Sequence, residues 1–200
     1  ACEVWARGAV RRRGGDTSEV WAGLWSDSGH AMKGGWVVNN ETATGLMSPL
    51  PEVRATIDAC GHPALFLVDT ISSLASLEFR MDDWGVDCVV GGSQKGLMLP
   101  TGMSFTGVSE KATAAHRVAG LKRYYFDWTL MEKRAQKSFI GTLPVNMFYG
   151  LRESVRLLEE EGLDHVVARH HRPAEATRRA GTARSGNNGP HAVCGAPARE

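Results

Sequence analysis

The chain has 200 residues, of which 42% are hydrophobic and 22% are charged, and its formal net charge is +1. This composition is typical of one globular domain or slightly more, with enough residues to bury a sizeable core. The near-zero net charge gives no argument for nucleic acid or an anionic membrane as a partner, and no apolar run approaches the roughly 18 residues of a membrane span. The four cysteines lie far apart without a C-x-x-C pair, which favours a reducing, cytosol-like compartment.

The first residues carry no signal-peptide pattern, and Ala1 in place of methionine indicates a processed or partial chain. A basic run, Arg11–Arg13, precedes two glycines and is interpreted as a solvated loop. Asp16–Glu19 is typical of a helix start, and Trp21 and Trp25 lie one helical turn apart behind it. We expect this tryptophan face to pack in the core.

Three short, continuously apolar segments predict strands that are buried on both faces. They are Gly35–Val38, Ala64–Val68 and Cys88–Val90. Between the first two, Pro51–Cys60 has a proline at a helix N-terminus and is closed by Gly61, so the pattern predicts a βαβ unit. The expected fold class is therefore α/β, with a mainly parallel sheet and flanking helices.

Each of these strands is followed by polar residues. Asn39 and Asn40 follow the first strand, Asp69 and Thr70 follow the second, and Ser93–Lys95 follows the third after two glycines. Parallel strands end at the same edge of a sheet, and open α/β sheets bind ligands at that carboxyl edge. The sequence therefore predicts a site there, with an aspartate and a lysine among its residues.

Beyond the lysine, Met103–Val108 predicts a further strand. Tyr124–Trp128 is an aromatic cluster that we expect to pack against the core. Phe139–Pro144 is expected to form a loop that carries Thr142.

Two helices are expected after this loop. The first carries an apolar stripe over residues 151–158 and ends at Gly162. The second, residues 163–171, is expected to be kinked or ended by Pro173. From Gly181 onward the composition predicts an irregular or disordered tail.

Asp69 and Lys95 together meet the needs of pyridoxal phosphate (PLP) chemistry. A lysine amine forms an imine with the cofactor aldehyde, and an acid keeps the pyridine nitrogen protonated so that the ring acts as an electron sink. Both residues follow strand ends of the predicted sheet, so we expect them to face one cleft.

Several motifs resemble the class V aminotransferases, and within that family the serine–glyoxylate and alanine–glyoxylate aminotransferase branch. They are Asn40–Gly45, Leu67–Leu74, Gly92–Gly102, Tyr149–Ser154 and Glu160–Asp164. They stand in the family's order at compatible spacing and cover roughly residues 16–180.

The resemblance implies a PLP-dependent transferase of the aspartate-aminotransferase fold type, usually a homodimer with its active site at the subunit interface. By the same resemblance, Lys95 forms the Schiff base and, once released, moves the proton between the substrate Cα and the cofactor, while Asp69 pairs with the pyridine nitrogen. The other cofactor-binding positions that it implies are Thr42 at the ring hydroxyl, Ile71 on the ring face, Gln94 at the phosphate, Ser93 beside the lysine, and Thr142, which reaches the phosphate of the neighbouring subunit.

The sequence matches only the middle of this family. The N-terminal phosphate-binding loop with its stacked aromatic ring and the C-terminal small domain with its substrate-clamping arginine are expected to be absent. Asn39 stands where the family usually has a histidine, and Pro173 interrupts a family helix. On this comparison residues 1–150 are part of the PLP-binding large domain, residues 151–180 lead to the small domain, and residues 181–200 form the tail.

The sequence therefore predicts a transaminase that moves an amino group from serine or alanine to glyoxylate, with no metal and no nucleic-acid or membrane partner. We expect a cytoplasmic location, or a peroxisomal one in a eukaryote. A serine–lysine hydrolase using Ser93 lacks an oxyanion loop, and Gly91–Gly96 does not match a P-loop. Two alternatives stay open: another class V PLP enzyme, such as a desulfurase or a different transaminase, and a non-catalytic fragment.

Overall fold

The computed structural model describes residues 25, 32–42, 45–135 and 137–185. The basic run Arg11–Arg13, the helix start at Asp16–Glu19 and Trp21 lie outside these residues. Trp25 lies within them, and its side chain is 3% exposed in the main core, as the sequence predicted.

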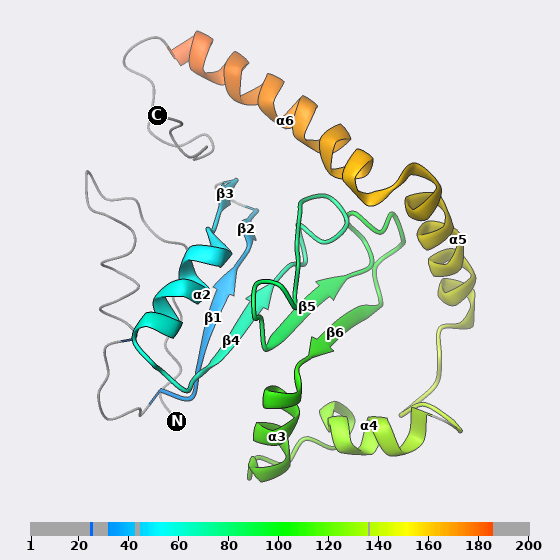
Figure 1. Ribbon diagram of the computed structural model, residues 1–200. Helices are drawn as coiled ribbons and strands as arrows, with labels where there is room; N and C mark the ends of the chain where they lie inside the picture. Colours follow the sequence, from blue (N-terminus) through cyan, green and yellow to red (C-terminus); the bar gives the residue numbers. More distant parts are fainter. Residues whose placement is uncertain (1–24, 26–31, 43–44, 136, 186–200) are drawn as a thin grey trace.

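A four-stranded sheet forms the centre of the fold. Its strands, in spatial order, are β1 (Gly34–Val38), β4 (Leu65–Asp69), β5 (Cys88–Gly92) and β6 (Ser104–Val108). The first three are parallel and β6 runs antiparallel to β5, as Figure 1 shows. The prediction of a mainly parallel sheet is confirmed, and so is the strand expected after the lysine. A short hairpin of β2 (Asn40–Glu41) and β3 (Leu46–Met47) follows β1.

Helix α2 (Leu50–Ala59) connects this hairpin to β4, with Pro51 in its first turn. Its apolar face is buried: Val53 and Ile57 are fully covered in one cluster with Phe66 of β4. Burying a side chain of this size contributes about 2 kcal/mol, so packing of α2 on the sheet stabilises the predicted βαβ unit.

Helices form most of the chain beyond β6. They are α3 (Glu110–Val118), the 3₁₀ turn η1 (Tyr124–Phe126), α4 (Trp128–Ala135), α5 (Val145–Glu161) and α6 (Leu163–Ser185). Helices α3 and α4 lie at the end of the sheet where β6 ends, whereas α5 and α6 lie beside the loops at the opposite end (Figure 1). The loop before α5 and the end of α5 at Gly162 are confirmed, although α5 begins earlier than the apolar stripe indicated.

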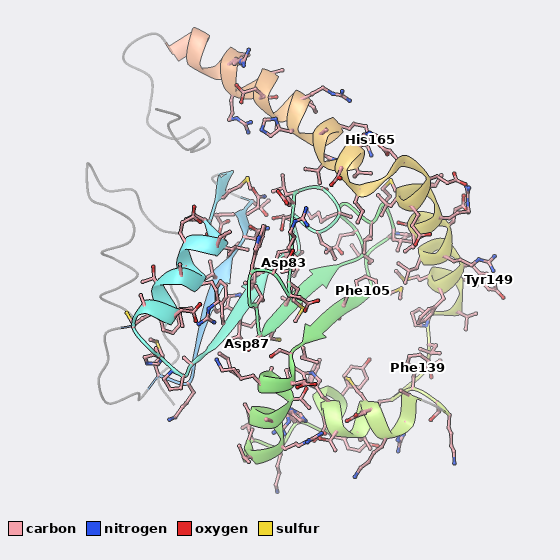
Figure 2. All side chains as sticks on the ribbon, in the orientation of Figure 1. Asp83, Asp87, Phe105, Phe139, Tyr149 and His165 are labelled. Atoms are coloured by element: carbon pink, nitrogen blue, oxygen red, sulfur yellow. The ribbon has the colours of Figure 1, made fainter. Side chains whose placement is uncertain are left out.

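A second, smaller core joins α5 and α6 to the sheet. It consists of buried Leu97, Leu158 and Val166, and Phe105 of β6, labelled in Figure 2, packs against it. This cluster fixes the two long helices beside the carboxyl edge of the sheet, where the site was predicted.

The expectation that the second of these helices ends at Pro173 is wrong, whereas a kink there stays a prediction. Helix α6 continues through Pro173 to Ser185, so the first residues after Gly181 are helical as well. Proline removes one intrahelical hydrogen bond, but this helix is largely exposed and solvent can satisfy the carbonyl that loses its donor. The hydroxyl of Thr177 and the Glu175 ion pairs stabilise the turn that follows. None of the helices in the ranges given above has the length and apolar character that crossing a membrane requires.

The expectation that the aromatic run after α3 packs against the core is also wrong for most of it. Tyr124, Tyr125 and Phe126 are 69%, 57% and 69% exposed. They occupy one turn of 3₁₀ helix, whose side chains point in different directions and cannot all reach one neighbouring element. Trp128 does pack, because its ring stacks on His116 with the centroids 4.9 Å apart.

Candidate active site at the carboxyl edge of the sheet

Hydrogen bonds join the ends of the three parallel strands into one unit. Asn39 is 2% exposed, and it donates from its amide to the Asp69 carbonyl and from Nδ2 to Ser73 Oγ, each at 2.9 Å. Thr70 donates from its amide (2.8 Å) and its hydroxyl (2.9 Å) to the Val90 carbonyl. The prediction that the polar residues after these strands share one edge is confirmed.

Asp69 is the last residue of β4 and lies in parallel register with Val90 of β5. Its Oδ1 accepts a hydrogen bond from the Ile71 amide at 2.8 Å, which makes an Asx turn and fixes the carboxylate. Its Oδ2 accepts no hydrogen bond from the described residues. A half-buried carboxylate oxygen that stays open can accept a strong hydrogen bond from a cationic N–H group of a ligand.

Two glycines let the chain after β5 approach its neighbours closely. A Cβ on Gly96 would lie 2.2 Å from the Leu74 carbonyl oxygen, so a larger residue does not fit there. A Cβ on Gly92 would lie 3.0 Å from Gln94 Oε1 and 3.4 Å from Ile71 Cγ2. Gln94 and Ile71 therefore lie on the same side of Gly92, and the structure brings these two predicted site residues together.

Residues 93–99, called the lysine loop below, carry Lys95. At the base of this loop Ser93 is fully buried. Its hydroxyl donates to the Pro100 carbonyl (2.7 Å) and accepts from the Met103 amide (3.3 Å). Ser93 therefore shapes the loop from within, and its assignment to the cofactor stays a prediction.

Lys95 itself is exposed, and its Nζ forms no hydrogen bond or ion pair with the described residues. Its carbonyl accepts from the Met98 amide at 2.8 Å, which closes a turn directly after the lysine. The result is an unpaired primary amine on a tight turn, beyond the strand that neighbours Asp69. An amine of this kind can condense with a carbonyl compound.

Thr42 and Thr142 are not brought to this edge by any hydrogen bond among the described residues. Thr42 is exposed in the turn after β2, and Thr142 is exposed in the loop before α5. Thr142 was assigned to the neighbouring subunit, so its position within one chain leaves that role a prediction.

Sequence reasoning missed the pair of serines that supports the end of β1. Besides the Asn39–Ser73 bond, the Ser72 hydroxyl donates to the Asn40 carbonyl at 2.6 Å, and Asn40 Nδ2 donates to Ser72 Oγ at 3.0 Å. These partners are 32 and 34 residues apart in the chain, so no local pattern reveals them. The one available signal was two adjacent serines directly after the acidic strand end.

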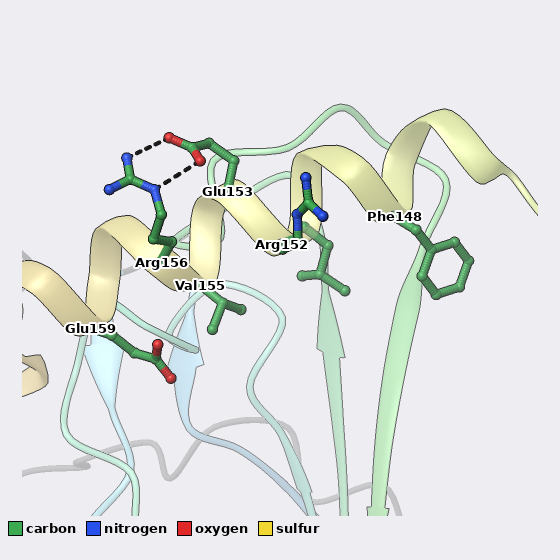
Figure 3. Close-up of a pocket in the computed structure, with 7 residues that line it drawn as sticks. Phe148, Arg152, Glu153, Val155, Arg156 and Glu159 are labelled. Atoms are coloured by element: carbon green, nitrogen blue, oxygen red, sulfur yellow. Dashed lines mark hydrogen bonds and ion pairs between the residues drawn. The ribbon is translucent and has the colours of Figure 1, made fainter.

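A shallow hollow on α5 is a separate feature, and two of the residues that line it, Arg152 and Arg156, are basic. Figure 3 shows Arg156 paired with Glu153, at 2.9 and 2.6 Å, and Arg156 also pairs with Glu160. These hydrogen bonds raise the pKa of Arg156 and lower that of Glu153. The Arg156 guanidinium is therefore already occupied, whereas the guanidinium of Arg152 lies over the Tyr149 ring, 5.7 Å from its centroid. Across the part of the chain that the structure describes, no group of three or more His, Cys, Asp or Glu side chains is placed to hold a metal ion.

With this geometry established, the chain was compared with known proteins. The model of the family "Aminotransferase class-V" matches residues 35–180, most of the chain and all of the edge described above. The chain belongs to the class V aminotransferase family.

Relatives of the chain include several glyoxylate aminotransferases. It is 45% identical to the serine–glyoxylate aminotransferase of Methylorubrum extorquens over 184 residues, which cover 89% of the chain and 44% of that protein. It is 46% identical to the L-aspartate–glyoxylate aminotransferase of Paracoccus denitrificans, covering 78% of the chain and 40% of that protein. The alanine–glyoxylate aminotransferase structure from Nostoc sp. is similar at a TM-score of 0.71 and 32% identity, covering 81% of the chain and 43% of that structure. The chain thus spans less than half of these relatives.

The family implies PLP as cofactor, and the residues at the edge fit this group. PLP carries an aldehyde, a ring nitrogen that is basic, and a phosphate. Lys95 offers an unpaired amine, and Asp69 offers a carboxylate oxygen that accepts no bond within the described chain. Ile71 and Gln94 lie against Gly92 between them, one apolar and one amide-bearing. The Lys95 amine suits the aldehyde carbon, the Asp69 carboxylate suits a protonated ring nitrogen, and the Ile71 side chain suits a flat ring face.

Proposed function

We propose that this chain is the cofactor-binding core of a PLP-dependent transaminase that moves an amino group from serine or alanine to glyoxylate. The substrate class rests on the relatives, whose names pair serine, aspartate or alanine with glyoxylate. Residues 1–150 are proposed as part of the PLP-binding large domain and residues 151–180 as the helices that lead to the small domain.

One observation carries the proposal. Asp69 and the lysine loop follow two adjacent parallel strands, because Asp69 lies beside Val90 and Lys95 follows five residues after Val90 in the chain. Both side chains present an open polar atom at this one edge. An acid and an amine held this way are what the cofactor needs.

When bound, PLP supplies an aldehyde and a ring that stabilises negative charge at the substrate Cα. Lys95 Nζ would condense with the aldehyde carbon, with the aldehyde oxygen leaving as water, and would thereby hold the group on the lysine loop. Once the substrate amine has taken its place on that carbon, the released neutral Nζ would take the proton from the substrate Cα and return it to the cofactor carbon. Asp69 Oδ2 keeps the ring nitrogen protonated by accepting its hydrogen bond. Ile71 packs on the ring face. The polar groups of the ring and phosphate are oriented by Gln94, Ser93 and Thr42.

We also propose that the chain works as a homodimer, with Thr142 reaching the site of the partner subunit. Exposed aromatic side chains support this. Tyr124 and Phe126 are both 69% exposed, and Phe139 and Tyr149, labelled in Figure 2, are 54% and 64% exposed. We expect a subunit interface to cover at least some of these side chains.

Two alternatives predict different results. Another class V activity, such as desulfuration, retains the Lys95 and Asp69 chemistry but uses a different substrate. A non-catalytic fragment binds PLP weakly or not at all. The purified protein is incubated with PLP and the visible absorbance of the lysine-bound cofactor is recorded, with Lys95→Ala as control. Amino transfer from serine or alanine to glyoxylate is then assayed through the glycine formed.

An absorbance band that Lys95→Ala removes, followed by glycine formation, supports the proposal. A band without glycine formation favours the other class V activity, and no band favours the fragment.

A further inference from the structure

A buried serine of α5 reaches the lysine loop from outside the sheet. Ser154 is 5% exposed, and its hydroxyl donates a hydrogen bond of 2.6 Å to the carbonyl of Leu97, a residue 57 positions earlier in the chain. Leu97 stands two residues after Lys95. This hydroxyl lies within the apolar cluster of Leu97, Leu158 and Val166 that joins α5 and α6 to the sheet.

The acceptor of this hydrogen bond is informative, because a serine inside a helix has a nearer acceptor available. Its hydroxyl can bond the carbonyl one turn earlier in its own helix. Ser154 instead crosses to the lysine loop, where the Leu97 carbonyl accepts it. A buried carbonyl without a donor destabilises the conformation that buries it, so this bond holds the loop in place.

The turn that it holds is strained. Met98 has a φ of 57°, a left-handed conformation that residues with a Cβ rarely adopt. Its side chain is 56% exposed. A left-handed residue of this type persists only where its surroundings fix it. The Met98 amide donates to the Lys95 carbonyl and the Leu99 amide to the Ser93 carbonyl, at 2.8 and 3.1 Å. The first of these bonds depends on the orientation of the peptide between Leu97 and Met98, which also carries the carbonyl that Ser154 binds.

The opposite side of the loop is fixed as well. Gly96 lies against the Leu74 carbonyl, and Ala75 next to it also has a positive φ, of 58°. The lysine loop is thus held between the segment after β4 and helix α5. On the α5 side, the support combines apolar packing of Leu97 with Leu158 and Val166 and one hydrogen bond, from the Ser154 hydroxyl.

We propose that Ser154 is a positioning residue for Lys95: its hydrogen bond to Leu97 holds the strained turn that directs the lysine amine toward the cofactor. The proposal rests on the proposed function of Lys95. Without the hydroxyl, the Leu97 carbonyl loses its buried donor and the peptide between Leu97 and Met98 can rotate, which relaxes Met98. The amine of Lys95 then samples several directions.

The first test measures the loop without any cofactor. In Ser154→Ala, hydrogen exchange of the Met98 and Leu99 amides is expected to be about tenfold faster than in the unmutated protein. Ser154→Cys fills the same space with a weaker donor and serves where the alanine variant does not fold. Thr113→Ala removes another hydroxyl bonded to a backbone carbonyl, at 3.0 Å in α3, and is expected to leave both amides unchanged.

The second test measures the lysine. PLP is added, bound cofactor is fixed with borohydride, and the rate of its attachment to the Lys95 peptide is followed by mass. Ser154→Ala is expected to slow attachment about tenfold, and adding Met98→Gly is expected to restore most of the rate because glycine adopts a positive φ freely.

Unchanged exchange of the Met98 and Leu99 amides in both Ser154 variants would overturn the proposal that Ser154 holds the lysine loop. Faster exchange with an unchanged attachment rate would overturn the positioning role. If the unmutated protein attaches no PLP, the proposed function fails, whereas the exchange experiment still decides whether Ser154 holds the loop.

Discussion

Asp87 Oδ2 accepts a hydrogen bond from the backbone amide of Phe66 at 2.9 Å, so a carboxylate completes the hydrogen bonding of β4 at the end of the sheet opposite the candidate site. Asp87 is 6% exposed, and its Oδ1 accepts from the Ser109 hydroxyl at 2.9 Å. Lys111 lies 3.4 Å from Oδ2. In Figure 2 Asp87 is labelled near the start of α3, so this carboxylate joins two strands to that helix.

Asp87→Ala is expected to lower the free energy of unfolding by about 3 kcal/mol, because it leaves the Phe66 amide and the Ser109 hydroxyl without their acceptor. Chemical denaturation of the two proteins measures the difference. Asp82→Ala removes an exposed carboxylate from a nearby turn and is expected to cost less than about 0.5 kcal/mol. Equal losses of unfolding free energy in Asp87→Ala and Asp82→Ala would show that the buried hydrogen bonds of Asp87 add no stability.

Acid sensitivity is expected from Asp127, which precedes α4. The Leu130 amide donates to its Oδ1 at 3.0 Å, and this bond, with smaller contributions from His116 and Arg123, lowers the pKa of Asp127 from its ordinary value of 3.8. A carboxylate whose pKa is lower in the folded state contributes stability above the unfolded pKa, and that stability is lost as the pH falls through the folded pKa. Unfolding followed by circular dichroism from pH 5 downward should therefore show a shallower loss of stability in Asp127→Asn than in the unmutated protein. The same slope in both proteins would contradict this assignment.

Gly96→Ala is expected to displace the lysine loop. The added Cβ would meet the Leu74 carbonyl oxygen at 2.2 Å, Ser76 Oγ at 2.5 Å and the Ala75 carbonyl carbon at 2.8 Å, so the segment 74–76 leaves little room for it. Overpacking of this kind costs about 1–3 kcal/mol, and we expect at least tenfold slower attachment of PLP to Lys95. The matched control is Gly120→Ala, since a Cβ there meets nothing within 4 Å. An attachment rate that is the same in both variants would mean that the close contact at Gly96 does not position the lysine.

The exposed aromatic surface around η1 predicts self-association. Phe126→Asp places a charge on a side chain that is 69% exposed and is expected to shift a dimer toward monomer in sedimentation velocity. Glu52→Lys changes a charge on the exposed side of α2 and should leave the dimer intact. Dimers that persist unchanged in Phe126→Asp would exclude this surface from the interface.

The strands and the edge that they share could be predicted from sequence because their signals are local. Continuously apolar runs such as Ala64–Val68 are typical of strands, although Leu65 and Leu67 are only half-buried, so the expected burial on both faces is not met. Gly96, after β5, allows a close approach to the Leu74 carbonyl. The predictions that were wrong concern features that depend on tertiary structure. Pro173 is tolerated because α6 is exposed, and Phe126 is exposed because one 3₁₀ turn cannot bury three rings. The Ser154–Leu97 bond joins residues 57 positions apart, which no periodicity encodes.

For the site, the sequence predicted a shared edge, and in the structure Asp69 is the last residue of β4 while Ile71, Gln94 and Lys95 follow the ends of adjacent strands. Their contacts with the cofactor stay predictions. The open oxygen of Asp69 offers a direct check of one of them. Asp69→Asn keeps the acceptor for the Ile71 amide but removes the charge that favours a protonated ring nitrogen, so PLP is expected to attach to Lys95 while amino transfer falls at least a hundredfold. Full amino transfer in Asp69→Asn would contradict the role given to this carboxylate.

The central claim is that Lys95 is the amine that holds the cofactor. The most direct measurement incubates the protein with PLP, reduces it with borohydride and locates the added mass among the lysine-containing peptides. We expect one modified peptide, the one that contains Lys95, and no such product in Lys95→Ala. Modification spread equally over exposed lysines such as Lys33 and Lys122, or none at Lys95, would contradict it.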